Sequence, residues 1–347
     1  MEIGRLALTL ALGILGGLLF MKLKVPGGMM VGAMTVIAVL GVTADMAYMP
    51  VEARTLAQMV AGAFIAVGMD KNDLLHMRHI PKPILILVGG MLVLNMTMGT
   101  IVYAVSDLDL VTALYSCVPG GVSDIPIIAD TAGANSGTVA LAQLARMITG
   151  IGVFPALIAK VAKSESPKVV KEAYDKAPEP EHTKKNIAFT LLAAVAFGLL
   201  GRLSGLPAGT MLFALIGVLA LKLIWNRAWL PIYIRRGAQV LSGCYIGSSI
   251  TRADVLGFGR LIVPILLILM GYVVACFGIG ALLKRFAGMT RREGMLAALP
   301  AGASDIALIS SDLGVTSPDL IVLQIVRMLS SVVIFPQLIN LILHQMS

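Results

Sequence analysis

The chain has 347 residues, of which 58% are hydrophobic and 13% charged, with a formal net charge of +8. Soluble domains are nearer about 45–50% apolar and about 25% charged, so the composition excludes an ordinary soluble globular protein and predicts an all-α integral membrane protein. The basic residues lie mainly between apolar runs, as membrane topology requires. Because no segment is long and polar enough to bind DNA, we expect no direct nucleic-acid partner.

About ten apolar runs are long enough to cross a bilayer. We expect transmembrane helices at 4–21, 26–43, 53–69, 83–105, 137–160, 186–202, 207–224, 234–250, 260–283 and 318–341. Two further apolar segments, 108–131 and 289–313, are broken by Pro and Gly into pieces of about ten residues, each about 15 Å of helix. Each segment is therefore either a re-entrant helical hairpin or one discontinuous spanning helix.

The second half of the chain repeats the first at an offset of 181 residues. The stretch Pro-Gly-Gly-Val-Ser-Asp-Ile at 119–125 returns at 300–306 as Pro-Ala-Gly-Ala-Ser-Asp-Ile, and 300 − 119 = 181. From 119 to 155, thirteen of 37 positions are identical at that offset. We therefore predict two membrane repeats, 1–160 and 186–347, joined by the polar linker 161–185, which is rich in Lys, Glu and Pro.

The basic residues also predict the orientation of the chain. If both broken segments are re-entrant and the N-terminus lies outside, twenty Lys and Arg are cytoplasmic and five lie outside. If both segments cross, the best split is 17 to 8, so the re-entrant model, with a cytoplasmic linker, fits better. Five crossings per repeat is an odd number, which predicts two inverted-topology repeats, an architecture that recurs among secondary transporters.

The two breaks are predicted to line a cavity, because unpaired backbone at membrane depth survives only when it is buried in protein or faces water. Glycine there permits conformations that a helix forbids, each serine is a predicted N-cap, and each aspartate then lies in the first helical turn. A capping and dipole role is the alternative to solute or ion binding. The residues concerned are Gly120, Gly121, Ser123, Asp124, Gly302, Ser304 and Asp305.

Two polar pairs follow the breaks. Gln143 and Arg146 are three residues apart and so share a helix face, as do Gln324 and Arg327. One interpretation is that each arginine pairs with the aspartate of its own repeat and locks hairpin to helix. Another is that the arginines balance the charge of an anionic solute, and a third is that the aspartates bind Na⁺ or carry H⁺.

Other polar residues give weaker indications. Asp130 and Asp312 lie near the turn after each break and are predicted to be turn and surface residues, with lining of the cavity entrance as the alternative. His76 and His79 have helical metal-ligand spacing but lack a second ligand pair, and the three cysteines have unrelated spacings. We therefore expect no metal site, no disulfide and no cofactor beyond a coupling Na⁺ or H⁺.

The doubled motifs PGGVSD…QLARM and PAGASD…QIVRM resemble the membrane AbrB family with its AbrB duplication, over essentially the whole chain. Members are labelled AbrB-type regulators or ammonia monooxygenases. Neither label fits these residues, since the four histidines form no metal cluster and no soluble DNA-reading element is present. The expected architecture is also similar to carriers of the bile-acid/sodium symporter and cation/proton antiporter types. The resemblance implies a bacterial inner membrane location.

These observations favour a secondary transporter, ion-coupled or exporting, for a small polar solute, with an anionic solute as one alternative. Alternating access would expose a site between the two hairpins. The competing hypothesis is a membrane-embedded sensor that affects gene expression indirectly. We expect no enzyme, because no nucleophile–base pair with an orienting group is evident. The expected partners are the lipid bilayer and the small-molecule solute, with assembly into a homo-oligomer as a further alternative.

Overall fold

The computed structural model describes residues 2–25, 27–161, 182–206, 208–300, 306, 310, 315 and 317–346. Among these residues the chain forms helices and connecting turns and no strand, which confirms the all-α prediction. Most of the predicted linker, 162–181, and most of the second break lie outside the described residues. Where the structure resumes, α10 begins at Lys184.

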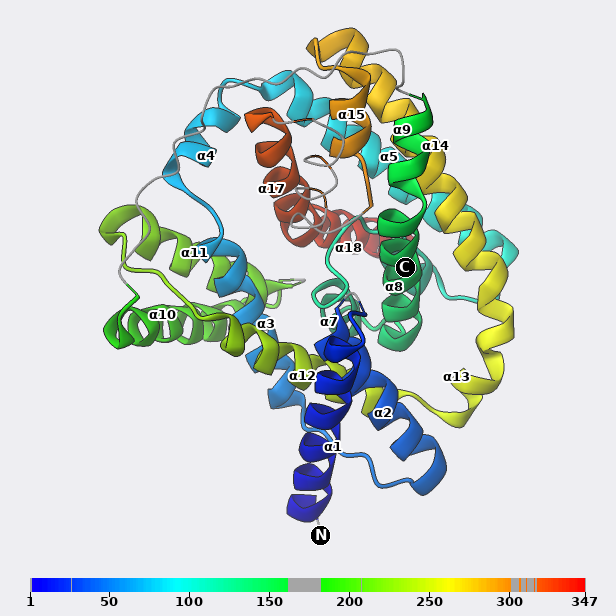
Figure 1. Ribbon diagram of the computed structural model, residues 1–347. Helices are drawn as coiled ribbons and strands as arrows, with labels where there is room; N and C mark the ends of the chain where they lie inside the picture. The colour runs from blue at the N-terminus through cyan, green and yellow to red at the C-terminus, as the bar shows by residue number, and fades with distance from the viewer. Residues whose placement is uncertain are drawn as a thin grey trace.

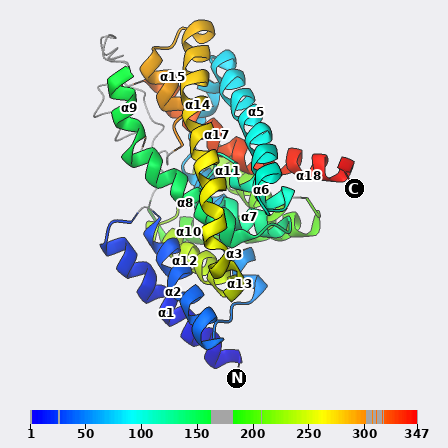
Figure 2. The same cartoon turned by 90° about the vertical axis from the view of Figure 1, so that its right-hand side faces the viewer.

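The helices form two bundles (Figures 1 and 2). In the first bundle, α2 packs against α12 and α3 against α11, so it mixes helices from both halves of the chain. Its members are α1 Glu2–Lys22, α2 Gly28–Ala44, α3 Val51–Val67, α10 Lys184–Leu203, α11 Gly209–Trp225 and α12 Ile232–Ser249.

The second bundle occupies the upper right of Figure 1 and is built around the long helices α5 and α14, which pack along each other. Its members are α5 Pro81–Val105, α6 Leu110–Ser116, α7 Ile125–Thr131, α8 Ser136–Gly152, α9 Phe154–Val161, α14 Ile262–Ala287, α15 Arg291–Ala297, α17 Pro318–Val333 and α18 Phe335–Met346. The bundles are connected by α4 Lys71–Met77 and by α13 Arg252–Gly257 with the short 3-10 helix η1 Phe258–Leu261.

Helix bounds in the two halves recur at the sequence offset. The helices α2 and α11 have 17 residues each and begin at Gly28 and Gly209, 181 residues apart. The seven-residue helices α6 and α15 begin at Leu110 and Arg291, again 181 apart. The packing of α1 on α2 is repeated by α10 on α11. The sequence identity is thus accompanied by a common order of helices.

The long helices indicate a multi-pass membrane protein that associates with a lipid bilayer. Among the described residues, five helices are long and apolar enough to cross, or six if the bent pair α3 and α4 counts as one span. The helices α2 and α11 are apolar but shorter. The expectation of about ten spans therefore exceeds what helix length and composition support. The five spans are Glu2–Lys22, Pro81–Val105, Lys184–Leu203, Gly259–Ala287 and Asp319–Gln345.

Two predicted spans are each divided in the structure. The span 137–160 consists of α8, which ends at Gly152, and α9, which begins at Phe154. Its counterpart 318–341 has a one-residue turn in the same place, between α17 and α18, although the two helices together still count as the one span Asp319–Gln345. A proline follows the phenylalanine in both copies. Proline has no amide hydrogen and crowds the preceding turn, which explains why a continuous helix stops here.

Glycine sets the closest helix crossings in the first bundle. A Cβ atom on Gly62 of α3 would overlap the carbonyl oxygen of Met211 in α11. A Cβ on Gly243 of α12 would overlap the carbonyl oxygen of Met30 in α2. Small residues at such crossings let helix backbones approach closely in membranes, so these two glycines fix the distance between the halves of the bundle.

Replacing Gly62 with alanine is expected to destabilise the protein, because α3 and α11 must separate to admit the methyl group. We expect a loss of about 1–3 kcal/mol, typical of overpacking, seen as a lower melting temperature in detergent. The matched control is Gly89→Ala in α5, where the new Cβ meets nothing within 4 Å. Equal melting temperatures for both variants would contradict this interpretation of the crossing.

Candidate functional site

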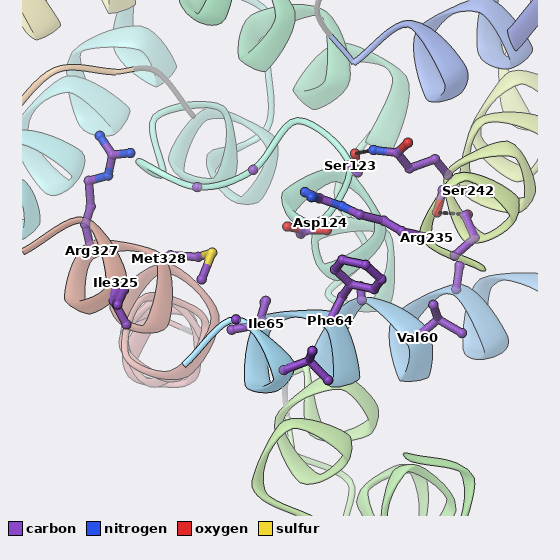
Figure 3. A pocket seen from close by; sticks show the side chains of 18 of the residues that line it. Val60, Phe64, Ile65, Ser123, Asp124, Arg235, Ser242, Ile325, Arg327 and Met328 are labelled. Atoms are coloured by element: carbon purple, nitrogen blue, oxygen red, sulfur yellow. Dashed lines mark hydrogen bonds between the residues drawn. The ribbon is translucent and has the colours of Figure 1, made fainter. Parts of the chain in front are cut away.

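A cavity of about 410 Å³ lies between the two bundles (Figure 3). Its walls come from α3 and α12 of the first bundle and from α17 and the break at 119–124 of the second. This volume is in the range of small-molecule sites, roughly 300–1,000 Å³. The cavity therefore sits where any movement of one bundle against the other would open or close it.

Part of the predicted site lines this cavity. The residues that do so are Gly120, Gly121, Ser123, Asp124, Gln324 and Arg327. Gln143 and Arg146 lie in α8, are buried, and do not line it. Gly302, Ser304 and Asp305 lie outside the described residues, as does Asp312. The first break is thus placed at the cavity, while the approach of two hairpin tips stays a prediction.

The start of α7 differs by one residue from the prediction. Asp124, and not Ser123, occupies the N-cap position, and its side chain makes no capping hydrogen bond. Ser123 Oγ instead accepts a hydrogen bond of 3.3 Å from Gln239 Nε2 of α12. Serine at the break therefore contacts the opposite bundle, and the helix starts at Ile125 with Pro126 in its first turn.

Asp124 is the acidic group of the cavity wall. No described residue donates a hydrogen bond to its carboxylate or forms an ion pair with it, although Arg235 extends toward it in Figure 3. The interpretation in which Arg146 pairs with Asp124 is not seen. A carboxylate accepts hydrogen bonds through both of its oxygens, so Asp124 has unused capacity to bind a cation or a solute.

Arg146 and Gln143 instead hold the C-terminal end of α6. Gln143 Nε2 donates to the carbonyl oxygens of Tyr115 (3.3 Å) and Val118 (3.0 Å). Arg146 donates to the carbonyl oxygens of Val118 (3.0 Å) and Gly120, and to the hydroxyl of Tyr272 (3.2 Å). The last carbonyls of a helix lack intrahelical partners, and a cation there also opposes the helix dipole. This physical need explains why Arg146 contacts backbone.

The second repeat has the same arrangement. Gln324 Nε2 donates to the carbonyl oxygens of Leu296 (3.1 Å) and Ala297 (3.3 Å), at the end of α15. Arg327 donates to the carbonyl oxygen of Leu299. The acceptors Leu296 and Leu299 are the offset counterparts of Tyr115 and Val118. The repeated glutamine–arginine pair is therefore a support for the backbone of each break.

The sequence analysis missed Arg235, which it counted only as a cytoplasmic charge. Arg235 lines the cavity, and its guanidinium carbon lies 5.3 Å from the ring centroid of Phe64 in α3. Arg235 forms no hydrogen bond or ion pair with any residue that the structure describes. One signal was available, because Arg235 is the offset counterpart of Arg54 (54 + 181 = 235), an arginine at the same place in its own repeat.

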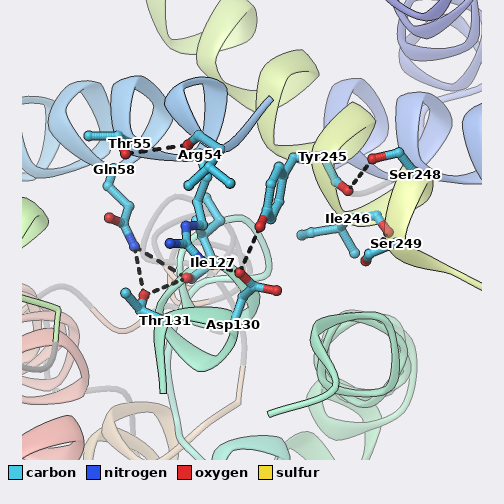
Figure 4. Close-up of polar contacts among 11 residues, drawn as sticks. Arg54, Thr55, Gln58, Ile127, Asp130, Thr131, Tyr245, Ile246, Ser248 and Ser249 are labelled. Carbon is cyan, nitrogen blue, oxygen red and sulfur yellow. Dashed lines mark hydrogen bonds and ion pairs between the residues drawn. The ribbon is translucent and has the colours of Figure 1, made fainter. Parts of the chain in front are cut away.

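The far end of α7 is tied to the first bundle (Figure 4). Arg54 of α3 forms an ion pair with Asp130, and the hydroxyl of Tyr245 in α12 donates to Asp130 Oδ2 at 3.1 Å. Gln58 Nε2 donates to the carbonyl oxygen of Ile127 (3.2 Å) and to Thr131 Oγ1 (3.1 Å). Asp130 is thus a helix residue joining two bundles, and its assignment to a surface turn was wrong.

The comparison with known families decides the classification. The family model described as transition state regulatory protein AbrB matches residues 1–80 and 30–343. The chain belongs to the AbrB family. Two relatives of this AbrB-family protein are each 24% identical to it. The uncharacterized protein YhjN of Bacillus subtilis (strain 168) aligns over 83% of this chain and 78% of its own length. The protein named putative regulator AbrB of Escherichia coli (strain K12) aligns over 97% and 94%.

Replacing Arg146 with alanine in this AbrB-family protein is expected to lower its stability. The carbonyl oxygen of Gly120 would lose its donor, whereas that of Val118 would keep the amide of Gln143, and an unsatisfied group costs about 1–3 kcal/mol. A melting curve in detergent measures the effect. The matched control is Arg236→Ala in α12, at an exposed position. Equal melting temperatures for Arg146→Ala and the control would show that the contacts of Arg146 with the break are dispensable.

Proposed function

We propose that this AbrB-family protein is a secondary transporter, ion-coupled or exporting, which moves a small polar solute by alternating access. The observation that carries the proposal is the position of the cavity, between two bundles and lined by both. The bundles pack mostly within themselves, and α7 is among the few elements that contact both. A rigid movement of one bundle would therefore change access to the cavity without unfolding either.

The chemistry of the cavity favours a solute with an anionic group. Arg235 offers a guanidinium that forms no hydrogen bond or ion pair with a described residue, beside the ring of Phe64 and within electrostatic reach of Asp124. Arginine binds carboxylates and phosphates through two parallel hydrogen bonds. Asp124 is then the group that binds Na⁺ or carries H⁺, so that solute and coupling cation meet in one cavity. No cofactor and no enzymatic step belongs to this proposal.

The proposed topology has two inverted repeats, with the N-terminus outside and the linker 161–185 in the cytoplasm of a bacterial inner membrane. The recurrence of helix bounds at the 181-residue offset and the charge count support it. In this orientation the Arg54 end of α3 faces outward, and Arg235 faces inward. The second break would enter as a re-entrant hairpin opposite the first, and its Gly302, Ser304 and Asp305 would complete the cavity.

Cysteine labelling tests the topology. We expect single cysteines placed at 106–109 and at 170–175 to react with a membrane-impermeant maleimide from opposite faces of the membrane, because an odd number of crossings separates them. Maleimide labelling is measured on right-side-out and on inside-out membrane vesicles. Labelling of both positions from one face would rule out the inverted arrangement.

The transport proposal is tested in two stages. A thermal-shift screen of small carboxylates and phosphates, with and without Na⁺, identifies a ligand, and counterflow in proteoliposomes then measures exchange. We expect Arg235→Gln to weaken the affinity for the anion by about tenfold or more, seen as a smaller thermal shift, because a charged hydrogen-bonding partner is lost. We expect Asp124→Asn to abolish coupled exchange.

The matched control is Arg236→Gln, on the neighbouring exposed position of α12, which should retain both properties. Undiminished exchange in Arg235→Gln and Asp124→Asn, with the fold intact, would remove both residues from the mechanism. Ligand binding without any counterflow would favour the second candidate function, a membrane-embedded sensor that affects gene expression indirectly. The name of the Escherichia coli relative, putative regulator AbrB, is the observation that favours a sensor.

A further inference from the structure

The two ends of the α3–α12 pair contain the same two side-chain types. At the 181-residue offset Arg54 corresponds to Arg235, and Phe64 corresponds to Tyr245 (64 + 181 = 245). The guanidinium carbon of Arg54 lies 5.5 Å from the ring centroid of Tyr245, and that of Arg235 lies 5.3 Å from the ring of Phe64. Each end therefore has one arginine stacked on an aromatic ring of the other helix.

The two ends nevertheless differ in what covers them. At the first end, Asp130 of α7 pairs with Arg54 and accepts the Tyr245 hydroxyl, and the side chains of both members of the ion pair are 18% exposed. At the second end lies the cavity, and Arg235 and Gly68 there are exposed. Neither Arg54 nor Tyr245 lines the cavity. Among the described residues, the helix pair is thus closed at one end and open at the other.

Alternating access needs this asymmetry, because a carrier must block one end of its site while the other is open. A sequence-symmetric pair of arginine–aromatic clusters with unequal contacts is what a molecule caught in one of its two states would show. The polar contacts that block the first end are few: one ion pair, the Tyr245 hydroxyl, and the amide of Gln58 on α7. Beside them, Ile127 of α7 shares a buried apolar cluster with Ala57 of α3 and Ile246 of α12. A partly exposed ion pair of this kind can be exchanged for water at modest cost.

We propose that Arg54, Asp130 and Tyr245 form a gate that closes the cavity at one face of the membrane, and that Arg235 and Phe64 belong to the open end in this state. The proposal rests on the proposed transport function. Opening the gate separates α7 from α3 and α12 and leaves Arg54 and Asp130 to water. In the orientation proposed above, the closed face is the outside and the cavity is open to the cytoplasm.

The test uses the full chain with its three buried cysteines replaced and one reporter, Val60→Cys, in the cavity wall. Oriented vesicles are treated with a membrane-impermeant maleimide from each face. In the parent we expect labelling from one face only. In Asp130→Asn and in Arg54→Gln we expect labelling from the opposite face to rise by roughly tenfold, as the population of the other state grows.

Tyr245→Phe is a milder variant, because it keeps the ring under Arg54 and removes only the hydroxyl, and a severalfold rise is expected. The matched control is Asp107→Asn, which removes a carboxylate from an exposed ion pair with Arg260 (3.4 Å). Parent-like labelling in all three gate variants, each still monodisperse, would overturn the gate. Labelling needs no solute, so a shifted pattern without counterflow would keep the gate and reject transport, whereas intact counterflow with unshifted labelling would reject the gate alone.

Discussion

The buried backbone of the break must find hydrogen-bond partners within the protein, and helices α8 and α14 of the second bundle supply them. In hydrocarbon no water is present to donate a hydrogen bond to an unpaired carbonyl oxygen. Gln143 and Arg146 supply donors to the end of α6, and Tyr272 of α14 donates to the carbonyl oxygen of Cys117 at 2.8 Å. The short helices α6 and α7 can therefore meet at a break inside the protein, which leaves Asp124 at the cavity wall.

The same constraint gives the arginines different roles, because some bind backbone carbonyls and others line the cavity. Arg146 is occupied by backbone, whereas Arg235 of α12, in the other bundle, lines the cavity and acts electrostatically on Asp124. The site is consequently shared: the second bundle provides Asp124 and the backbone of the break, and the first bundle provides Arg235, Phe64 and Gln239. A shared site responds to relative movement of the bundles, whereas a site within one bundle would not.

Much of the architecture was predictable from the sequence, and the reasons for the failures are physical. The apolar composition predicted helices, and the 181-residue offset predicted equal helix orders in the two halves. The break near Gly152 was missed because apolar content continues through it and only the Phe-Pro pair marks it. Arg235 was counted only as a cytoplasmic charge and Asp130 was assigned to a surface turn, since hydropathy gives no information on which helix faces a cavity or which carboxylate meets an arginine 76 residues away.

In the proposed transport cycle the two bundles move as units around a shared cavity. Double electron–electron resonance between spin labels at Leu192 in α10 and Met270 in α14, both exposed and one in each bundle, measures their separation in proteoliposomes. We predict two distance populations whose ratio differs between the wild type and Asp130→Asn. A single distance, unchanged in both proteins, would contradict the account.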